Sequence, residues 1–168
     1  RADIERPMVL VSSSGTQLLY NARFCDAAYA ACFRNHEAVA EHVAGRHARV
    51  AVIGAGSRGE FREEDQMCCA WIAGRLIERG YVADDSNTAA IVERWRGAPV
   101  EACLTSKSAG YLKRSKQLDD LDFVLTHVND LDAVFALDDD EVVRVVSAAC
   151  PIQTQDALSE LLPQGANA

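Results

Sequence analysis

The sequence predicts an α/β protein of the layered α/β/α type with a mostly parallel or mixed sheet. Short apolar runs alternate with segments of helical length, an order typical of such folds. Apolar residues make up 49% of the chain and aromatic residues 7%, which suits a compact core of Ala, Val and Leu. The 168 residues suffice for one domain but not for two of ordinary size. We expect one α/β domain over residues 1–140, lacking an N-terminal portion, and a C-terminal strand and tail over residues 141–168.

Six apolar segments are predicted as strands. Arg49–Ile53 is the clearest of them, because it is rich in Val and Ile and is followed by the glycine-rich segment Gly54–Gly59. The others are shorter or more mixed in composition. In chain order the six are Met8–Val11, Ala28–Phe33, Arg49–Ile53, Asp122–Leu125, Ala133–Leu137 and Val142–Val146.

Five segments are predicted as helices from their periodicity and end signals. Val39 and Val43 lie four residues apart, and Gly45 and Gly80 mark the ends of the helices that precede them. Asp85 precedes another helix as a candidate N-cap. The predicted helices are Gln17–Phe24, His36–Ala44, Glu63–Arg79, Asp85–Arg96 and Ser108–Lys116.

Charge and cysteine usage narrow the classes of function. The formal net charge of −8 disfavours binding to nucleic acid or to an anionic membrane surface. Six cysteines show neither a CxxC pair nor zinc-type spacing, and four of them lie in apolar runs. We therefore expect a reduced, cytoplasmic protein without nucleic-acid or membrane partners.

The first candidate site is the turn of sequence SSSGT over residues 12–16. The opening turn of a helix leaves backbone N–H groups without partners, and phosphates bind there readily. Its donors are the hydroxyl and backbone groups of Ser13, Ser14, Gly15 and Thr16. The alternative is an ordinary helix cap, for which Ser and Thr are favoured anywhere.

The second candidate is the loop GAGSRG, in which Gly54, Gly56 and Gly59 match GxGxxG after a predicted strand. That match suggests dinucleotide binding and an oxidoreductase. Against it, the next helical pattern begins well after the glycines, and the strand is the third of the chain. The loop is better interpreted as a flexible site segment in which Arg58 and Arg62 bind oxyanions.

The third candidate is the acidic start of the predicted helix Glu63–Arg79. On a helical period Asp65 shares a face with Cys69 and Ile72, whereas Glu64 lies on a more mixed face. An inward carboxylate at this position caps the helix, pairs with an arginine or holds a cation such as Mg²⁺. Acids that merely complement the helix dipole are the simpler alternative.

A cysteine-phosphatase interpretation is rejected. Cys69 and Arg75 have the CxxxxxR spacing, but the chemistry needs a loop of free backbone N–H groups around a thiolate. In the middle of a predicted helix those N–H groups are already bonded.

Taken in order, the segments resemble the 2-phosphosulfolactate phosphatase (ComB-like) family. Val9–Thr16 is similar to that family's strand followed by TTNGT, and Asn35 falls on the asparagine of its Ser-Phe-x-Asn. Glu64–Ala70 is similar to Glu-Asp-x-x-Cys-Ala-Gly. Asp85-Ser86 and Ser108–Leu112 complete the order. Ser14 and Ala70 depart from the family's Asn and Gly, and the family's N-terminal motifs have no counterpart.

The resemblance implies a magnesium-dependent phosphatase that converts 2-phosphosulfolactate to sulfolactate and phosphate, a step of coenzyme M biosynthesis. It also allows a homo-oligomer. The implied roles are Mg²⁺ binding or general-base catalysis for Asp65 and Glu64, and orientation of phosphate or water for Asn35. Substrate binding falls to Ser13, Ser14, Gly15, Thr16, Gly56, Arg58 and Arg62. A non-catalytic protein that binds small anions on the same scaffold is the alternative.

Overall fold

The computed structural model describes residues 14–145, and the predicted strand Met8–Val11 and Ser13 lie outside this range. Helices and strands are both present, as predicted. The helices are α1 (Gly15–Asn21), α2 (His36–Val43), α3 (Glu63–Glu78), α4 (Ser86–Trp95), α5 (Lys107–Arg114) and α6 (Leu118–Thr126), with 3₁₀ turns η1 (Ala22–Phe24) and η2 (Val100–Thr105). The strands are β1 (Tyr29–Ala30), β2 (Val134–Asp138) and β3 (Glu141–Val145).

The described strands form one small sheet in the order β1-β2-β3, and both pairs are antiparallel. Tyr29 pairs with Ala136, and Val134 pairs with Val145 across the β2–β3 hairpin. The parallel pairing that the alternating pattern predicted is not seen among residues 14–145. Arg49–Ile53 is extended but has no strand partner within the same range.

Two of the predicted strands are wrong. Arg49–Ile53 has no regular secondary structure. Asp122–Leu125 lies inside α6, and not in the sheet. Leu121 is buried and Leu125 packs against the second core cluster, so the apolar residues recur every four positions rather than every two. Asp119 and Asp120 in the first turn favour the helix further, because carboxylates complement the positive end of its dipole.

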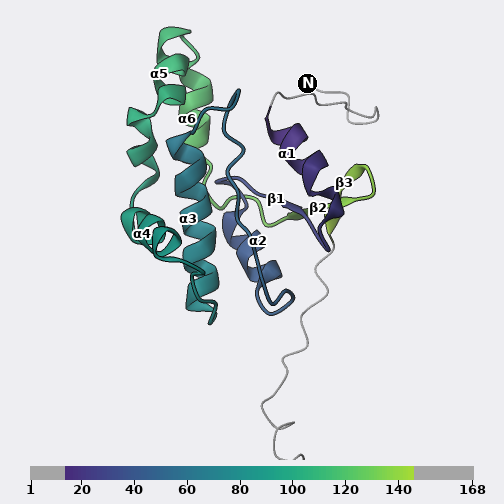
Figure 1. Ribbon diagram of the computed structural model, residues 1–168. Coiled ribbons are helices and arrows are strands. Elements are labelled where there is room, and N and C mark those ends of the chain that lie inside the picture. Colours follow the sequence, from purple (N-terminus) through teal and green to yellow (C-terminus); the bar gives the residue numbers. More distant parts are fainter. Residues whose placement is uncertain (1–13, 146–168) are drawn as a thin grey trace, which may run out of the picture.

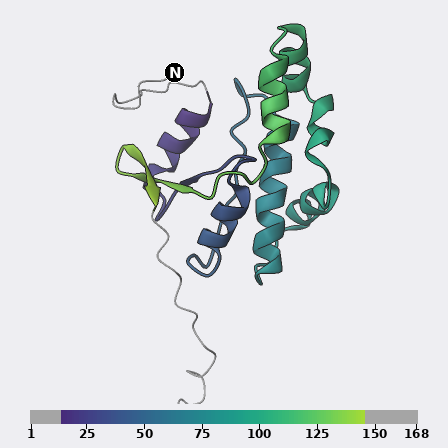
Figure 2. The same cartoon turned by 180° about the vertical axis from the view of Figure 1, so that it is seen from behind.

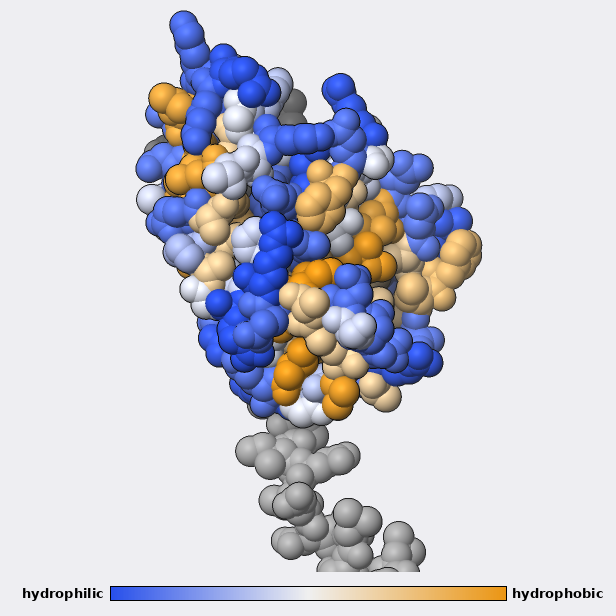
Figure 3. All heavy atoms as spheres, turned by 60° about the vertical axis from the view of Figure 1, so that its left-hand side comes forward, coloured by the Kyte–Doolittle hydropathy of each residue, from blue (hydrophilic) through white to orange (hydrophobic). Residues whose placement is uncertain are grey.

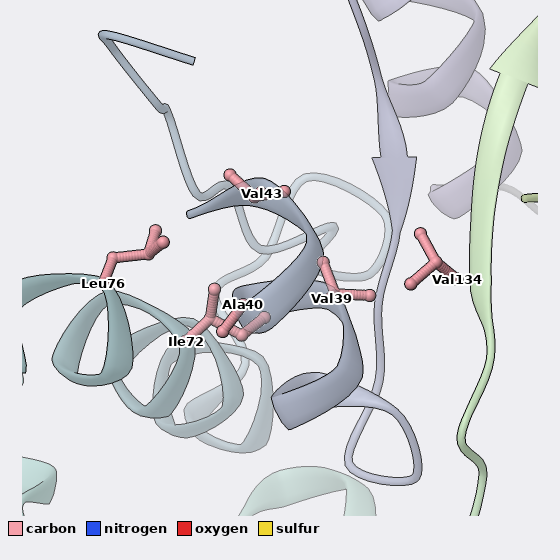
Figure 4. Close-up of a cluster of buried hydrophobic side chains, with 6 residues drawn as sticks. All are labelled: Val39, Ala40, Val43, Ile72, Leu76 and Val134. Atoms are coloured by element: carbon pink, nitrogen blue, oxygen red, sulfur yellow. The ribbon is translucent and has the colours of Figure 1, made fainter. Parts of the chain in front are cut away.

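Helix α2 lies between the sheet and α3, α4 lies on the opposite side of α3, and α5 and α6 lie beyond the upper end of α3 in both views (Figures 1 and 2). The first core cluster joins the sheet, α2 and α3 across this arrangement. Figure 4 shows its six side chains directed toward one another from α2, α3 and β2. They are Val39, Ala40, Val43, Ile72, Leu76 and Val134.

A second cluster fixes α3 against α4 and η2. Met67 is fully buried, and Ala70, Trp95 and Cys103 pack around it. The indole Nε1 of Trp95 donates a hydrogen bond to Gln66 Oε1 at 3.0 Å. Since α3 is held by both clusters, its first turn and the loop that precedes it have a rigid support.

Several large apolar side chains are not buried by the described residues. Figure 3 shows apolar residues gathered in the middle of one face, with hydrophilic residues dominating its periphery. The most exposed in the molecule include Phe24 at 82% and Val82 at 90%. Scattered exposed apolar residues are normal in soluble proteins and carry no conclusion by themselves. No helix within residues 14–145 has the length and apolar character needed to cross a membrane.

His36, at the start of α2, is expected to make stability depend on pH. Its ring is 5% exposed, and burial lowers its pKa below the ordinary value of 6.5. Nδ1 lies 3.0 Å from the carbonyl oxygen of Phe33, and Nε2 faces the amide nitrogen of Asn129 at 3.4 Å. A carbonyl only accepts and the Asn129 nitrogen only donates, so the neutral Nδ1–H tautomer fits and a second proton does not.

The unfolded chain therefore binds more protons than the folded one between the lowered pKa and about pH 6.5. Stability should be full above that window and fall as the pH drops through it. Chemical unfolding measured from pH 8 to pH 5 checks this, with His36→Gln as the comparison. The variant should show a flatter profile, not a level one, because burial also lowers the pKa of His42. An unchanged slope in the variant would contradict the assignment to His36.

Candidate anion-binding site

The segment before α3 contains a tight two-residue turn. Ser57 and Glu60 exchange backbone hydrogen bonds, each at 2.9 Å, so that Arg58 and Gly59 form the tip. Arg58 has φ of 52° and Gly59 has φ of 75°. Two successive positive φ angles are the combination of a type I′ turn. The turn, with Gly54–Gly56 before it, is called here the glycine loop.

The carboxylate of Asp65 holds the glycine loop against α3. The backbone N–H of Gly56 donates to Asp65 Oδ2 at 2.6 Å. A Cβ atom at Gly54 would lie 3.0 Å from Asp65 Cβ, so the chain passes this side chain closely. Burial raises the pKa of Asp65, and the Gly56 hydrogen bond opposes that rise. The structure therefore brings together Asp65 and the glycine loop, which the sequence identified separately.

Gly56 is the most constrained position of the loop. Its φ is +65°, and a Cβ atom there would lie 2.7 Å from the carbonyl oxygen of Glu60. The glycines thus serve a hairpin turn, and α3 begins only at Glu63 with three acids in its first turn. Dinucleotide-binding glycines instead lead directly into a helix whose positive end faces the pyrophosphate. The geometry of this loop differs from that arrangement.

Glu64 points to a different side of α3. Its Oε2 atom is buried and has no hydrogen-bond partner among the described residues. Burial raises the pKa of Cys103 in η2, and the charge of Glu64 raises it further. The two acids therefore face different neighbours, Asp65 the glycine loop and Glu64 the η2 turn.

Two cations meet the carboxylate of Glu60 beside the turn. Glu60 Oε2 accepts from Arg62 Nη1 at 3.0 Å and from Lys107 Nζ at 3.2 Å. Lys107 is the first residue of α5, a helix whose cap is the Ser106 hydroxyl accepting from Ala109 N at 3.2 Å. Lys107 was not predicted as a site residue from the sequence. The feature that could have indicated Lys107 is its position directly before the Ser-x-Gly segment.

The turn at the start of α1 also reaches the glycine loop. The Ser14 hydroxyl oxygen accepts from the backbone N–H of Arg58 at 3.2 Å, across 44 residues of sequence. Gly15 and Thr16 open α1 next to it. The two predicted anion-binding elements are therefore in contact.

Asn35 is built into the scaffold. It is 2% exposed, and its Oδ1 accepts from Cys32 N at 2.8 Å. Its Nδ2 donates to the carbonyl oxygens of Ala30 at 3.3 Å and Ala133 at 3.1 Å. Both amide hydrogens are thus used on backbone groups beside β1 and β2. This arrangement favours a structural role, and the predicted catalytic role stays a prediction.

The thiols near α3 are unsuited to nucleophilic chemistry. Burial raises the pKa of Cys69 to about 11, and the pKa of Cys68 also rises through burial. Arg75 pairs with Glu37 and Glu78 instead of facing a phosphate loop. A protonated thiol is a poor nucleophile, which supports the rejection of the CxxxxxR interpretation.

A metal ion bound at the start of α3 would have few protein ligands. No cluster of three or more His, Cys, Asp or Glu able to hold a metal occurs in the described part of the chain. Mg²⁺ commonly uses only one or two carboxylates and completes its shell with water and substrate phosphate. The Glu64 Oε2 atom has no hydrogen-bond partner among the described residues and Asp65 is half-buried, so each acid, on its own side of α3, fits as a single carboxylate ligand of that sparse type of site.

The fold and the site define an α/β protein with a carboxylate-held glycine loop flanked by cations. Residues 4–140 match the profile of the 2-phosphosulpholactate phosphatase family, and the chain belongs to this family. It is similar to a protein of Parasynechococcus marenigrum named "Probable 2-phosphosulfolactate phosphatase", with 32% identity over 109 residues, 61% of this chain and 45% of that protein. A protein of the same name from Clostridium perfringens is 26% identical over 142 residues, 83% of this chain and 57% of that protein. The chain thus spans about half the length of the curated relatives it matches.

Proposed function

We propose that this chain forms part of a phosphatase that hydrolyses a small, highly anionic phosphate monoester, with 2-phosphosulfolactate as the first substrate to test. The observation that carries the proposal is the 2.6 Å hydrogen bond from Gly56 N to Asp65 Oδ2. It places the glycine loop and its cations at the acidic start of α3, in a chain of this family. Water attacks phosphorus, the ester P–O bond breaks, and the alcohol leaves as sulfolactate.

The residues of the site divide this work. Arg58 and Arg62 bind the carboxylate or sulfonate of the substrate, and each charge-assisted bond contributes about 1.5–3 kcal/mol. Asn35 orients phosphate or water only if its side-chain amide gives up its hydrogen bonds to the backbone groups described above. Backbone and hydroxyl donors that cradle the phosphoryl oxygens come from Ser13, Ser14, Gly15 and Thr16. Gly56 shapes the loop beside them and donates to phosphate only if its N–H leaves Asp65 Oδ2.

Glu64 and Asp65 are proposed to hold Mg²⁺ directly or through water, or one of them acts as the general base. When bound, the ion neutralises charge that develops on the phosphoryl oxygens. Asp65 meanwhile keeps Gly56 in place through Oδ2. Its second oxygen has no hydrogen bond within residues 14–145 and stays available to water or a cation.

We also propose a larger, layered sheet than β1–β3. Although Arg49–Ile53 has no regular secondary structure, Val50 and Val52 pack against the first core cluster and Ile53 is 64% exposed. This alternation is that of a strand with one buried face. A partner strand alongside it would give the predicted α/β/α arrangement. Cytoplasmic location and a homo-oligomer stay predictions.

The proposed activity is tested by phosphate release from a panel of phosphorylated hydroxy acids, with Mg²⁺ and with EDTA. Release from 2-phosphosulfolactate in Mg²⁺ that EDTA abolishes is the expected result. Binding of the panel members without turnover would favour the alternative, a non-catalytic anion-binding protein. That alternative is motivated by Ser14 and Ala70, which stand where the family has Asn and Gly. If the folded chain shows neither binding nor turnover, both the phosphatase proposal and the anion-binding alternative are contradicted.

A further inference from the structure

We propose that Arg62 and Lys107 bind the carboxylate or sulfonate of the substrate. In the free protein the carboxylate of Glu60 occupies this binding position. The inference rests on the proposed function, because the substrate class is a phosphate monoester that carries a second anionic group. The substrate carboxylate or sulfonate replaces Glu60 between the two cations. Lys107 thereby becomes a specificity-determining residue of the site.

The first observation is that a carboxylate already occupies this position. One oxygen, Glu60 Oε2, lies 3.0 Å from Arg62 Nη1 and 3.2 Å from Lys107 Nζ. The two cations come from separate elements, since Arg62 precedes α3 and Lys107 begins α5. The site therefore holds a carboxylate oxygen between two fixed elements, which is the chemistry that a substrate carboxylate or sulfonate needs.

The second observation is that Glu60 is easily exchanged. Its side chain is 58% exposed and that of Lys107 is 78% exposed, whereas Arg62 is 16% exposed. Exposed ion pairs are weak because water and salt screen them. Glu60 can therefore turn to water while Arg62 stays in place.

The third observation is the position of Glu60 in the chain. Glu60 closes the type I′ turn, two residues after Arg58 and four after Gly56. Its backbone is fixed by the two hydrogen bonds to Ser57, so exchange requires only side-chain rotation. The backbone of the turn therefore keeps its geometry when the carboxylate leaves.

Direct binding of sulfolactate to the full chain in EDTA, measured by calorimetry, tests the inference without needing turnover. Lys107→Met should weaken sulfolactate binding about tenfold or more, the range of a charge-assisted bond. Glu60→Gln should tighten it several-fold, because the internal competitor loses its charge. Neither substitution should change the affinity for inorganic phosphate, which has no second anionic group.

Lys113→Met is the matched control, because Lys113 lies on the same helix and its Nζ donates to the Leu104 carbonyl at 3.1 Å. This variant should bind sulfolactate like the wild type. Wild-type affinity in Lys107→Met, or equal losses for sulfolactate and phosphate, would overturn the inference. So would undetectable sulfolactate binding by the wild type. If these binding results hold but no phosphate is ever released, the binding site for the acidic group stands and the proposed catalytic function fails.

Discussion

Replacement of Asp65 by asparagine is expected to lower phosphate release by about a hundredfold to ten-thousandfold, the usual contribution of a general base or comparable group. The amide is isosteric with the carboxylate and its oxygen still accepts from Gly56 N, a bond of 2.6 Å in the native protein. The glycine loop should therefore keep its shape while the negative charge is lost. Steady-state phosphate release and a denaturant unfolding curve, measured on the same preparation, separate the two effects.

Glu63→Gln is the matched control for Asp65→Asn. It removes one negative charge from the same first turn of α3, two residues away. Glu63 contacts Arg94 at 3.4 Å and has no hydrogen bond to the glycine loop within residues 14–145, so turnover should change little. Equal losses in the two variants would point to the summed charge of the helix start. Full activity in Asp65→Asn would contradict a catalytic or metal-binding role for Asp65.

Gly56→Ala is expected to disrupt the glycine loop and with it the activity. The added Cβ would lie 2.7 Å from the Glu60 carbonyl oxygen, and the residue has φ of +65°. A non-glycine residue in this region costs about 1–3 kcal/mol, and the backbone clash adds to that cost. We expect a lower free energy of unfolding. We also expect phosphate release to fall by more than the loss of stability explains, because the hydrogen bond from Gly56 N to Asp65 is lost.

Gly59→Ala isolates the clash from the backbone strain. Gly59 has a similar φ of +75°, but a Cβ there has no neighbour within 4 Å. Its substitution should cost about 1 kcal/mol of stability and leave most of the activity. Arg58, with φ of 52°, shows that this turn accepts a side chain at positive φ. If both alanine variants behave alike, the close approach at Gly56 is unimportant.

Helices α1 to α5 were predictable from the sequence because their signals are local, whereas α6 was not predicted. The acids of α3 and the Asp85 cap of α4 mark their first turns, and Asp85 does accept from Thr88 N at 2.6 Å. Periodicity also placed Asp65 on the inward side of α3. The strands were less predictable, because their pairing depends on residues far away in sequence. An apolar run such as Leu121–Leu125 fits a strand by composition and a helix by spacing.

The site was predictable in its parts but not in its assembly. Asp65, Gly56, Arg62 and Ser14 were each identified from local patterns. The contacts that join them, such as Ser14 to Arg58 at 3.2 Å, span 44 residues and follow from the fold alone. Lys107 was missed for the same reason, since its partner Glu60 lies 47 residues away. A buried asparagine such as Asn35 is chemically ambiguous until its partners are seen.

The most direct measurement follows the glycine amides while 2-phosphosulfolactate is added in EDTA. The chain has ten glycines, so ¹⁵N-glycine labelling gives a short, assignable spectrum. Gly54, Gly56 and Gly59 report the proposed site, while Gly45, Gly80 and Gly97 follow other elements as internal references. The predicted result is saturable chemical-shift changes at Gly54, Gly56 and Gly59, with the signals of the reference glycines unchanged. Shifts confined to the reference glycines, or none at millimolar ligand, would contradict a substrate site at this loop.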